Sequence, residues 1–197
     1  MIVTEPWWMF SEIVDAATCD RILELGLSLT QERGRGRTDE LEQQRKTRIA
    51  WIREEWVYDV VEPWVYRANR EAGWNFDVER MQSLQFGIYA DGGHYDWHFD
   101  MTGRVYSERD EVAPEFHGLL RKISFSLQLN DPSEYDGGDF EIELGLPSDT
   151  NRIERPNPKR TRGSLVVFPS FLPHRVTPVT RGVRYSLVSW LCGKPWR

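Results

Sequence analysis

The feature that most constrains the fold is an alternation of apolar and polar side chains in the second half of the chain. It is strongest over residues 123–130, where isoleucine, phenylalanine and leucine alternate with serine, glutamine and asparagine. A period of two puts the apolar residues on one face of an extended strand and the polar residues on the other. Shorter runs of the same kind recur from Met81 to Leu191, separated by turn residues. The pattern predicts many short strands.

The first 80 residues follow a different period. Apolar residues at helical spacing predict a helix over residues 11–29, capped by Asp15, and a second helix from about Glu54 to Ala72. Pro63 lies inside the second helix, where we expect a kink or a restart. The fold class is therefore predicted as α+β, mainly β: a double-stranded β-helix (jelly roll) with N-terminal supporting helices. We expect one domain over residues 1–197, with 1–80 as helical support and 81–197 as the jelly-roll core.

Composition argues against several classes of function. The 197 residues carry 25 Lys and Arg against 31 Asp and Glu, and this net charge of −6 disfavours a nucleic-acid partner. Cys19 and Cys192 lie far apart without metal-binding spacing, so a reduced, cytoplasmic protein is expected. Neither a signal peptide nor an apolar run of about 20 residues is found, so we expect no membrane partner. The sequence leaves the oligomeric state open.

Two His-x-Asp motifs lie close together in the chain. His98 and Asp100 are separated by one residue, so both project to the same face of a strand. They would supply two of the three ligands of a 2-His-1-carboxylate site, which is typical of non-haem Fe(II) oxygenases. His94 and Asp96 have the same spacing, and spacing alone does not choose between the two copies or exclude an exposed polar turn. A further histidine, His174, lies between predicted strands.

A candidate carboxylate anchor follows near the C-terminal end. Arg184 and Ser186 are two residues apart on the last predicted strand, so their side chains share a face. A guanidinium can bind a carboxylate through two parallel hydrogen bonds, and a nearby hydroxyl can add a third. A metal ligand and a carboxylate anchor in one segment would suit a chelating dicarboxylic co-substrate.

Several motifs occur in a fixed order: Tyr89-x-x-Gly92-x-x-Tyr95-x-x-His98-x-Asp100, residues 129–140, Phe168-Pro-Ser, and residues 174–184. Together they resemble the Fe(II)/2-oxoglutarate dioxygenases of the prolyl-4-hydroxylase-like superfamily, and the bacterial PKHD-type hydroxylases in particular. The resemblance covers roughly residues 81–192.

The resemblance implies a site and an activity. It selects His98, Asp100 and His174 as the Fe(II) ligands, and it leaves His94, Asp96 and His117 outside the metal site. Arg184, Tyr89 and Ser186 would bind 2-oxoglutarate, with O₂ as the other co-substrate and ascorbate as an additional cofactor that the family admits. The implied reaction hydroxylates an unactivated C–H bond of a protein, a peptide or an amino-acid side chain and releases succinate and CO₂. Animal-type prolyl 4-hydroxylases usually have lysine in place of Arg184, which puts peptidyl proline in doubt as the substrate.

Two rival functions stay open at this stage. One is a catalytically silent jelly-roll scaffold or sensor that keeps the site. The other is a nucleic-acid demethylase, disfavoured by the acidic charge and by the lack of that group's second arginine shortly after Arg184. Three polar segments, 31–46, 101–120 and 145–162, are expected as loops around the mouth of the barrel. We expect the 101–120 loop to be mobile and to close over the iron when substrate binds.

Overall fold

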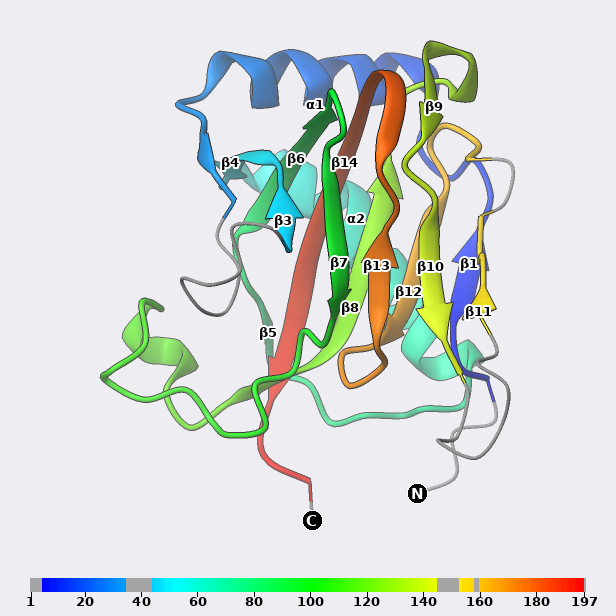
Figure 1. Ribbon diagram of the computed structural model, residues 1–197. Helices are drawn as coiled ribbons and strands as arrows, with labels where there is room; N and C mark the ends of the chain where they lie inside the picture. The colour runs from blue at the N-terminus through cyan, green and yellow to red at the C-terminus, as the bar shows by residue number, and fades with distance from the viewer. Residues whose placement is uncertain (1–4, 35–43, 145–152, 158–159, 197) are drawn as a thin grey trace.

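The structure is a computed structural model and describes residues 5–34, 44–144, 153–157 and 160–196. Its core is a pair of antiparallel sheets that face each other, as the jelly-roll prediction requires (Figure 1). The major sheet has the order β1 (Trp8–Phe10), β12 (Leu165–Pro169), β8 (Leu120–Gln128), β14 (Val179–Gly193), β6 (Leu84–Ala90), β4 (Arg48–Ile52) and β2 (Glu32–Arg33), with β5 (Arg80–Met81) and β9 (Tyr135–Gly137) also paired to β14. The minor sheet has the order β11 (Ile153–Glu154), β10 (Phe140–Glu143), β13 (His174–Val176), β7 (His94–His98) and β3 (Arg45–Lys46).

Both predicted helices are present. α1 spans Ala16–Ser28, and the Asp15 carboxylate caps it by accepting a hydrogen bond of 2.7 Å from the Thr18 amide. α2 spans Glu55–Glu71 and continues through Pro63, so the expected restart there is wrong. Pro63 is exposed, and the missing amide hydrogen bond is therefore lost on the solvent side. The opposite side of α2 is held by four fully buried residues, Val57, Val61, Val65 and Ala68.

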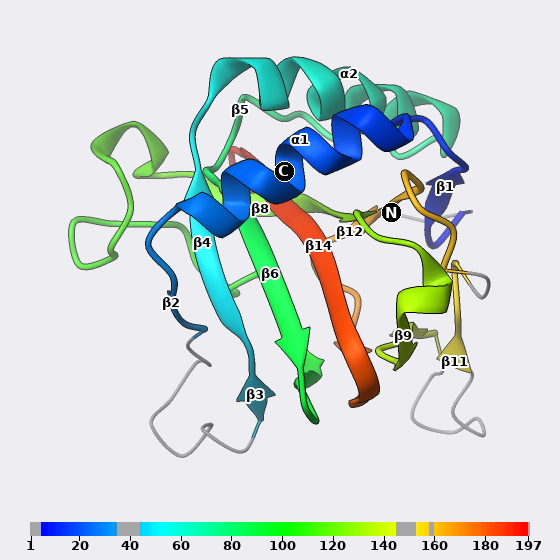
Figure 2. The ribbon, with the colours of Figure 1, turned by 90° about the horizontal axis from the view of Figure 1, so that it is seen from above.

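The major sheet buries both of its faces. Figure 2 shows α1 and α2 lying across one face, where Phe86, Leu127 and Leu187 join the main hydrophobic cluster with the helices. The polar residues that alternate with this apolar row, such as Ser126 and Gln128, are also buried, at 8% and 5% exposure. They line cavities between the two sheets. The space between the two sheets is therefore lined partly by polar side chains, whereas the apolar core lies between the major sheet and the helices.

Where the structure describes them, the three polar segments are mostly irregular, as predicted, with short pieces of regular structure. Segment 31–46 contributes β2 and β3 at its ends, while residues 35–43 lie outside the described residues. Segment 101–120 contains a 3₁₀ turn, Pro114–Phe116, and buries Tyr106 and Leu119 against Cys192. Segment 145–162 is described only at 153–157 and 160–162, where it forms β11. In the parts of the chain that the structure describes, no helix is long and apolar enough to cross a bilayer.

Candidate metal and co-substrate site

Three predicted ligands meet between the ends of β7 and β13. His174 and His98 face each other in the antiparallel register of these strands, and Asp100 follows directly after β7. The amides of Asp100 and Met101 both donate to the carbonyl of Ser170, at 3.1 and 2.9 Å, which fixes the backbone beside the carboxylate. One ligand atom from each of the three residues lies within 4.8 Å of the others. His174 Nε2 is 3.4 Å from one carboxylate oxygen of Asp100, and His98 Nε2 is 3.8 Å from the other.

Both histidines are held in the tautomer that a metal ligand requires. His98 Nδ1 lies 2.8 Å from the carbonyl oxygen of Asp96, and His174 Nδ1 lies 3.0 Å from that of Leu172. A carbonyl only accepts hydrogen bonds, so each Nδ1 carries the proton and each Nε2 presents a lone pair toward Asp100. Metal-binding histidines typically use one ring nitrogen in this way while the other is tied to a carbonyl or carboxylate.

The electrostatics of the cluster also suit a cation. Burial and the neighbouring His174 lower the pKa of His98 to about 3, so its imidazole is neutral near pH 7. Burial by itself would raise the pKa of Asp100, but interactions with His174 and His98 outweigh it and hold that pKa below its usual range. The group therefore offers two imidazoles and one carboxylate, which together form the donor set of a 2-His-1-carboxylate site.

Aromatic rings pack against the histidines and shield them from water. The ring of Tyr95 stacks on His98 with the centroids 3.5 Å apart. The ring of Phe168 meets His174 edge-on at 4.6 Å, and Phe140 lies 5.7 Å from the same imidazole. His98, Asp100 and His174 are at most 9% exposed as a result. A dry environment of this kind strengthens metal–ligand electrostatics.

The second His-x-Asp copy is not part of the cluster. His94 is half-buried, with its Nδ1 2.9 Å from the carbonyl oxygen of Gly92. Asp96 is exposed and accepts a hydrogen bond from the amide of Trp97 at 2.8 Å. Within the described residues, His98, Asp100 and His174 form a cluster of three potential metal ligands, and neither His94 nor His117 belongs to it.

The predicted carboxylate anchor lies in the same cavity as the triad. Arg184 and Ser186 on β14 pair with Tyr89 and Gly87 on β6, respectively. A β-carbon on Gly87 would come within 3.1 Å of the Ser186 hydroxyl and 3.2 Å of the Tyr89 ring, so glycine there leaves room between the two. Arg184 is 3% exposed, and one of its terminal nitrogens, Nη1, has no hydrogen-bond partner.

This cavity has a volume of about 240 Å³. Its lining includes the six residues that we predicted: Tyr89, His98, Asp100, His174, Arg184 and Ser186. It also includes Arg45, Gln85, Arg121 and Trp190, to which we assigned no role from the sequence. Those four residues also line a neighbouring groove of about 900 Å³, to which the 101–120 segment contributes Glu111, Val112, Ala113, Glu115 and Phe116. The metal cluster therefore opens onto a large surface groove.

Arg45 illustrates why the sequence did not predict that these four residues line the cavity. It lies at the end of a charged, glycine-rich run that reads as a solvated loop, yet it is 7% exposed. Its guanidinium donates to Gln85 at 2.7 Å and to Thr47 at 2.9 Å, and it packs over the ring of Tyr95 at 4.5 Å. The sequence offered one signal, the polar half of the alternation, whose residues Ser126 and Gln128 prove to be buried.

Comparison with known proteins agrees with this arrangement. Residues 84–192 match the family model described as the 2OG-Fe(II) oxygenase superfamily. A PKHD-type hydroxylase of Teredinibacter turnerae is 35% identical over 113 residues, which are 57% of this chain and 44% of that protein. The PKHD-type hydroxylase PiuC of Pseudomonas aeruginosa is 35% identical over 106 residues, which are 53% of this chain and 41% of that protein. The chain thus spans less than half the length of the curated relatives it matches.

Solved structures share the fold at lower identity. A Pseudomonas putida prolyl-4-hydroxylase aligns with a TM-score of 0.60 and 23% identity, covering 98% of this chain and 95% of that one. A Trichoplax adhaerens prolyl hydroxylase, solved with a hypoxia inducible factor peptide fragment, aligns with a TM-score of 0.66 and 19% identity, covering 95% and 84%. The family model matches more than half of the chain, in the segment that holds the metal triad and the buried arginine. The chain therefore belongs to the 2OG-Fe(II) oxygenase superfamily.

Proposed function

We propose that the protein is an Fe(II)- and 2-oxoglutarate-dependent hydroxylase. The observation that carries the proposal is that the metal triad and the underbonded Arg184 open into one cavity. In this assignment His98, Asp100 and His174 hold Fe(II), and Arg184, Tyr89 and Ser186 bind 2-oxoglutarate. When bound, Fe(II), 2-oxoglutarate and O₂ supply the chemistry that hydroxylates an unactivated C–H bond and yields succinate and CO₂.

The residues present fit these groups. Three protein ligands leave coordination positions open on an octahedral metal for the chelating keto acid and for O₂. The buried guanidinium of Arg184 needs an anion, because an unpaired buried charge is costly, and a carboxylate is its best geometric match. The hydroxyl of Ser186 adds one donor beside it. Tyr95 and Phe168 would keep water from the reacting atoms.

The groove beside the cavity supports a substrate larger than a free metabolite. With a volume of about 900 Å³, it is lined by aromatic residues, among them Trp51, Tyr58, Phe116 and Trp190, and by four arginines and four glutamates. An extended peptide could lie there and project one side chain past Arg121 toward the iron. We therefore assign a protein, a peptide or an amino-acid side chain as the substrate. The complex of the Trichoplax adhaerens relative with a peptide fragment is consistent with this class.

The test is succinate formation with Fe(II), 2-oxoglutarate and O₂, combined with mass spectrometry of candidate peptides for the gain of one oxygen atom. Binding of 2-oxoglutarate to the Mn(II)-loaded protein is measured in parallel by calorimetry. A hydroxylase binds the keto acid and forms succinate, and the Asp100→Ala variant forms none.

Two other outcomes would assign a different function. Binding without any succinate, in the presence of peptides that saturate the groove, would favour the silent sensor. Oxygen transfer to oligonucleotides but not to peptides would favour the demethylase.

A further inference from the structure

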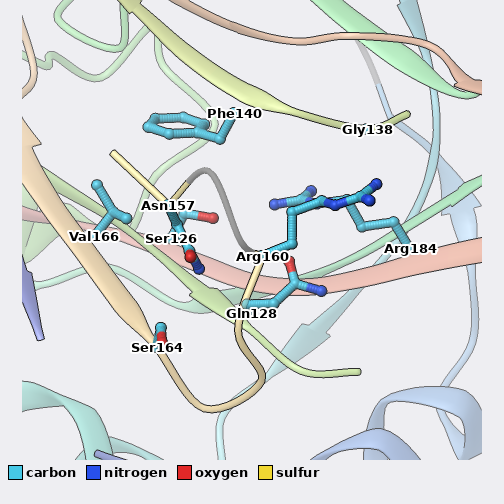
Figure 3. Close-up of a pocket in the computed structure, with 9 residues that line it drawn as sticks. All are labelled: Ser126, Gln128, Gly138, Phe140, Asn157, Arg160, Ser164, Val166 and Arg184. Atoms are coloured by element: carbon cyan, nitrogen blue, oxygen red, sulfur yellow. The ribbon is translucent and has the colours of Figure 1, made fainter. Parts of the chain in front are cut away.

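A small pocket adjoins the co-substrate cavity, and Figure 3 shows the residues that line it. It shares Ser126, Phe140 and Arg184 with the cavity that contains the metal triad. Its volume is about 20 Å³, which is room for one water-sized group such as a carboxylate oxygen. Two arginines line it, Arg184 from β14 and Arg160 from the segment after β11, and none of the described residues in its lining is acidic.

A buried arginine at this pocket indicates an anionic ligand. Arg184 is 3% exposed, and its Nη1 lacks a hydrogen-bond partner of good geometry. A guanidinium carries five donors and no acceptor, so only an acceptor group can satisfy it. Leaving such a group unbonded in the interior is expensive. In Figure 3 the side chains of Arg160 and Arg184 extend toward each other across the pocket.

Arg160 is held in this position by its own contacts. Its Nη1 donates to the carbonyl of Gly137 at 2.8 Å, and its guanidinium carbon lies 4.9 Å from the centre of the Tyr135 ring. The backbone of Arg160 has φ 53°, in the left-handed region that non-glycine residues rarely adopt. The nearby carboxylate of Asp136 is bonded to Arg181 at 2.6 Å. Arg160 is thus held, at a backbone cost, in a position where its side chain lines the pocket.

We infer that Arg160 is a second binding residue for the distal carboxylate of the 2-oxo acid and forms a two-arginine clamp with Arg184. The inference rests on the proposed function, since it assumes that a 2-oxo dicarboxylate occupies the cavity. Two cations around one carboxylate select strongly for a charged distal end. The segment that carries Arg160, which we expected at the mouth of the barrel, would then serve the co-substrate instead of the substrate.

The test is calorimetric titration of the Mn(II)-loaded protein with 2-oxoglutarate and with 2-oxopentanoate, which has the same five-carbon chain but no distal carboxylate. Arg160→Ala should raise the Kd for 2-oxoglutarate about tenfold, because one charge-assisted contact is lost, and should leave the Kd for 2-oxopentanoate unchanged. Arg160→Gln keeps a donor for the Gly137 carbonyl and should show the same loss of selectivity. Arg155→Ala is the matched control: it removes one positive charge from the same segment, but Arg155 pairs with Glu141 and does not line the pocket.

The outcomes separate this inference from the proposed function. Failure of the wild-type protein to bind 2-oxoglutarate at all would overturn both. Tight binding by the wild type, with equal affinity in Arg160→Ala, would overturn the clamp alone. An equal loss of affinity for both ligands in Arg160→Ala and Arg160→Gln would also overturn it, since Arg160 would then act only as a structural support.

Discussion

Gly138 offers a sharp test of whether the position of Arg184 determines co-substrate binding. It has φ +66°, and a β-carbon there would lie 2.9 Å from Cδ of Arg184 and 2.9 Å from Cγ2 of Val179. Gly138→Ala should cost about 1–2 kcal/mol of stability for the left-handed backbone and about 1–3 kcal/mol for the overpacking. The aliphatic part of the Arg184 side chain must also move, which would displace its guanidinium. The loss of one charge-assisted hydrogen bond should then raise the Kd for 2-oxoglutarate about tenfold or more.

Gly118 provides the matched control. Its φ is +82°, but no atom lies within 4 Å of where its β-carbon would be, so Gly118→Ala should cost only the backbone share of about 1–2 kcal/mol. Urea denaturation of the metal-free proteins measures stability, and calorimetry with Mn(II) measures binding of 2-oxoglutarate. Equal destabilisation of the two variants, together with wild-type affinity in Gly138→Ala, would refute the argument that the glycine makes room for the arginine.

Three further predictions follow from the site and its support. Alanine at any of the three metal ligands should abolish Fe(II)-dependent succinate formation with the fold retained, whereas His94→Ala should keep most activity; reversed sensitivities of His94 and His98 would mean that the wrong pair was chosen. Arg184→Lys should raise the 2-oxoglutarate KM before metal affinity falls, and Ser186→Ala should do so by about 1–2 kcal/mol; unchanged KM in either variant contradicts its assignment. Burial would raise the pKa of Glu141, but hydrogen bonds from two arginines outweigh it and lower that pKa. The ionised carboxylate therefore stabilises the fold above the unfolded glutamate pKa of about 4.3, and this stabilisation is lost as pH falls through the lowered pKa. The stability gap between wild type and Glu141→Gln in urea denaturation should therefore shrink below about pH 4, and a gap that stays constant down to pH 2 would contradict this.

Much of the fold was predictable because local patterns determine it. Asp15 caps α1 as expected, and the alternation from residue 123 corresponds to β8. The restart predicted at Pro63 was wrong because packing of the buried side of α2 keeps the helix continuous. A proline on the exposed side removes only one hydrogen bond. Tertiary packing overrode the local signal there.

The site was predictable only in part. His98 and Asp100 share a short motif, so their proximity is local, but His174 reaches them only through the pairing of β13 with β7. Its role came from the resemblance, because strand pairing cannot be read from spacing. Arg45 and Arg160 were hidden in charged segments, where burial depends on which strand lies opposite. The residues that flank them in the sequence do not distinguish them from solvated arginines.

The strand that carries His174 is short and is held in register mainly by its neighbours, β7 and β10. β13 is three residues long, has an irregularity between His174 and Val176, and is flanked by Pro173 and Pro178, which cannot donate to a ladder. A slip of one residue would turn the imidazole away from Asp100. A metal that binds all three ligands would therefore act as a cross-link between β7 and β13, contributing about 2.7 kcal/mol at a hundredfold excess over its Kd. Metal binding would therefore be coupled to the pairing of β7 with β13, and metal loading would stabilise this part of the minor sheet.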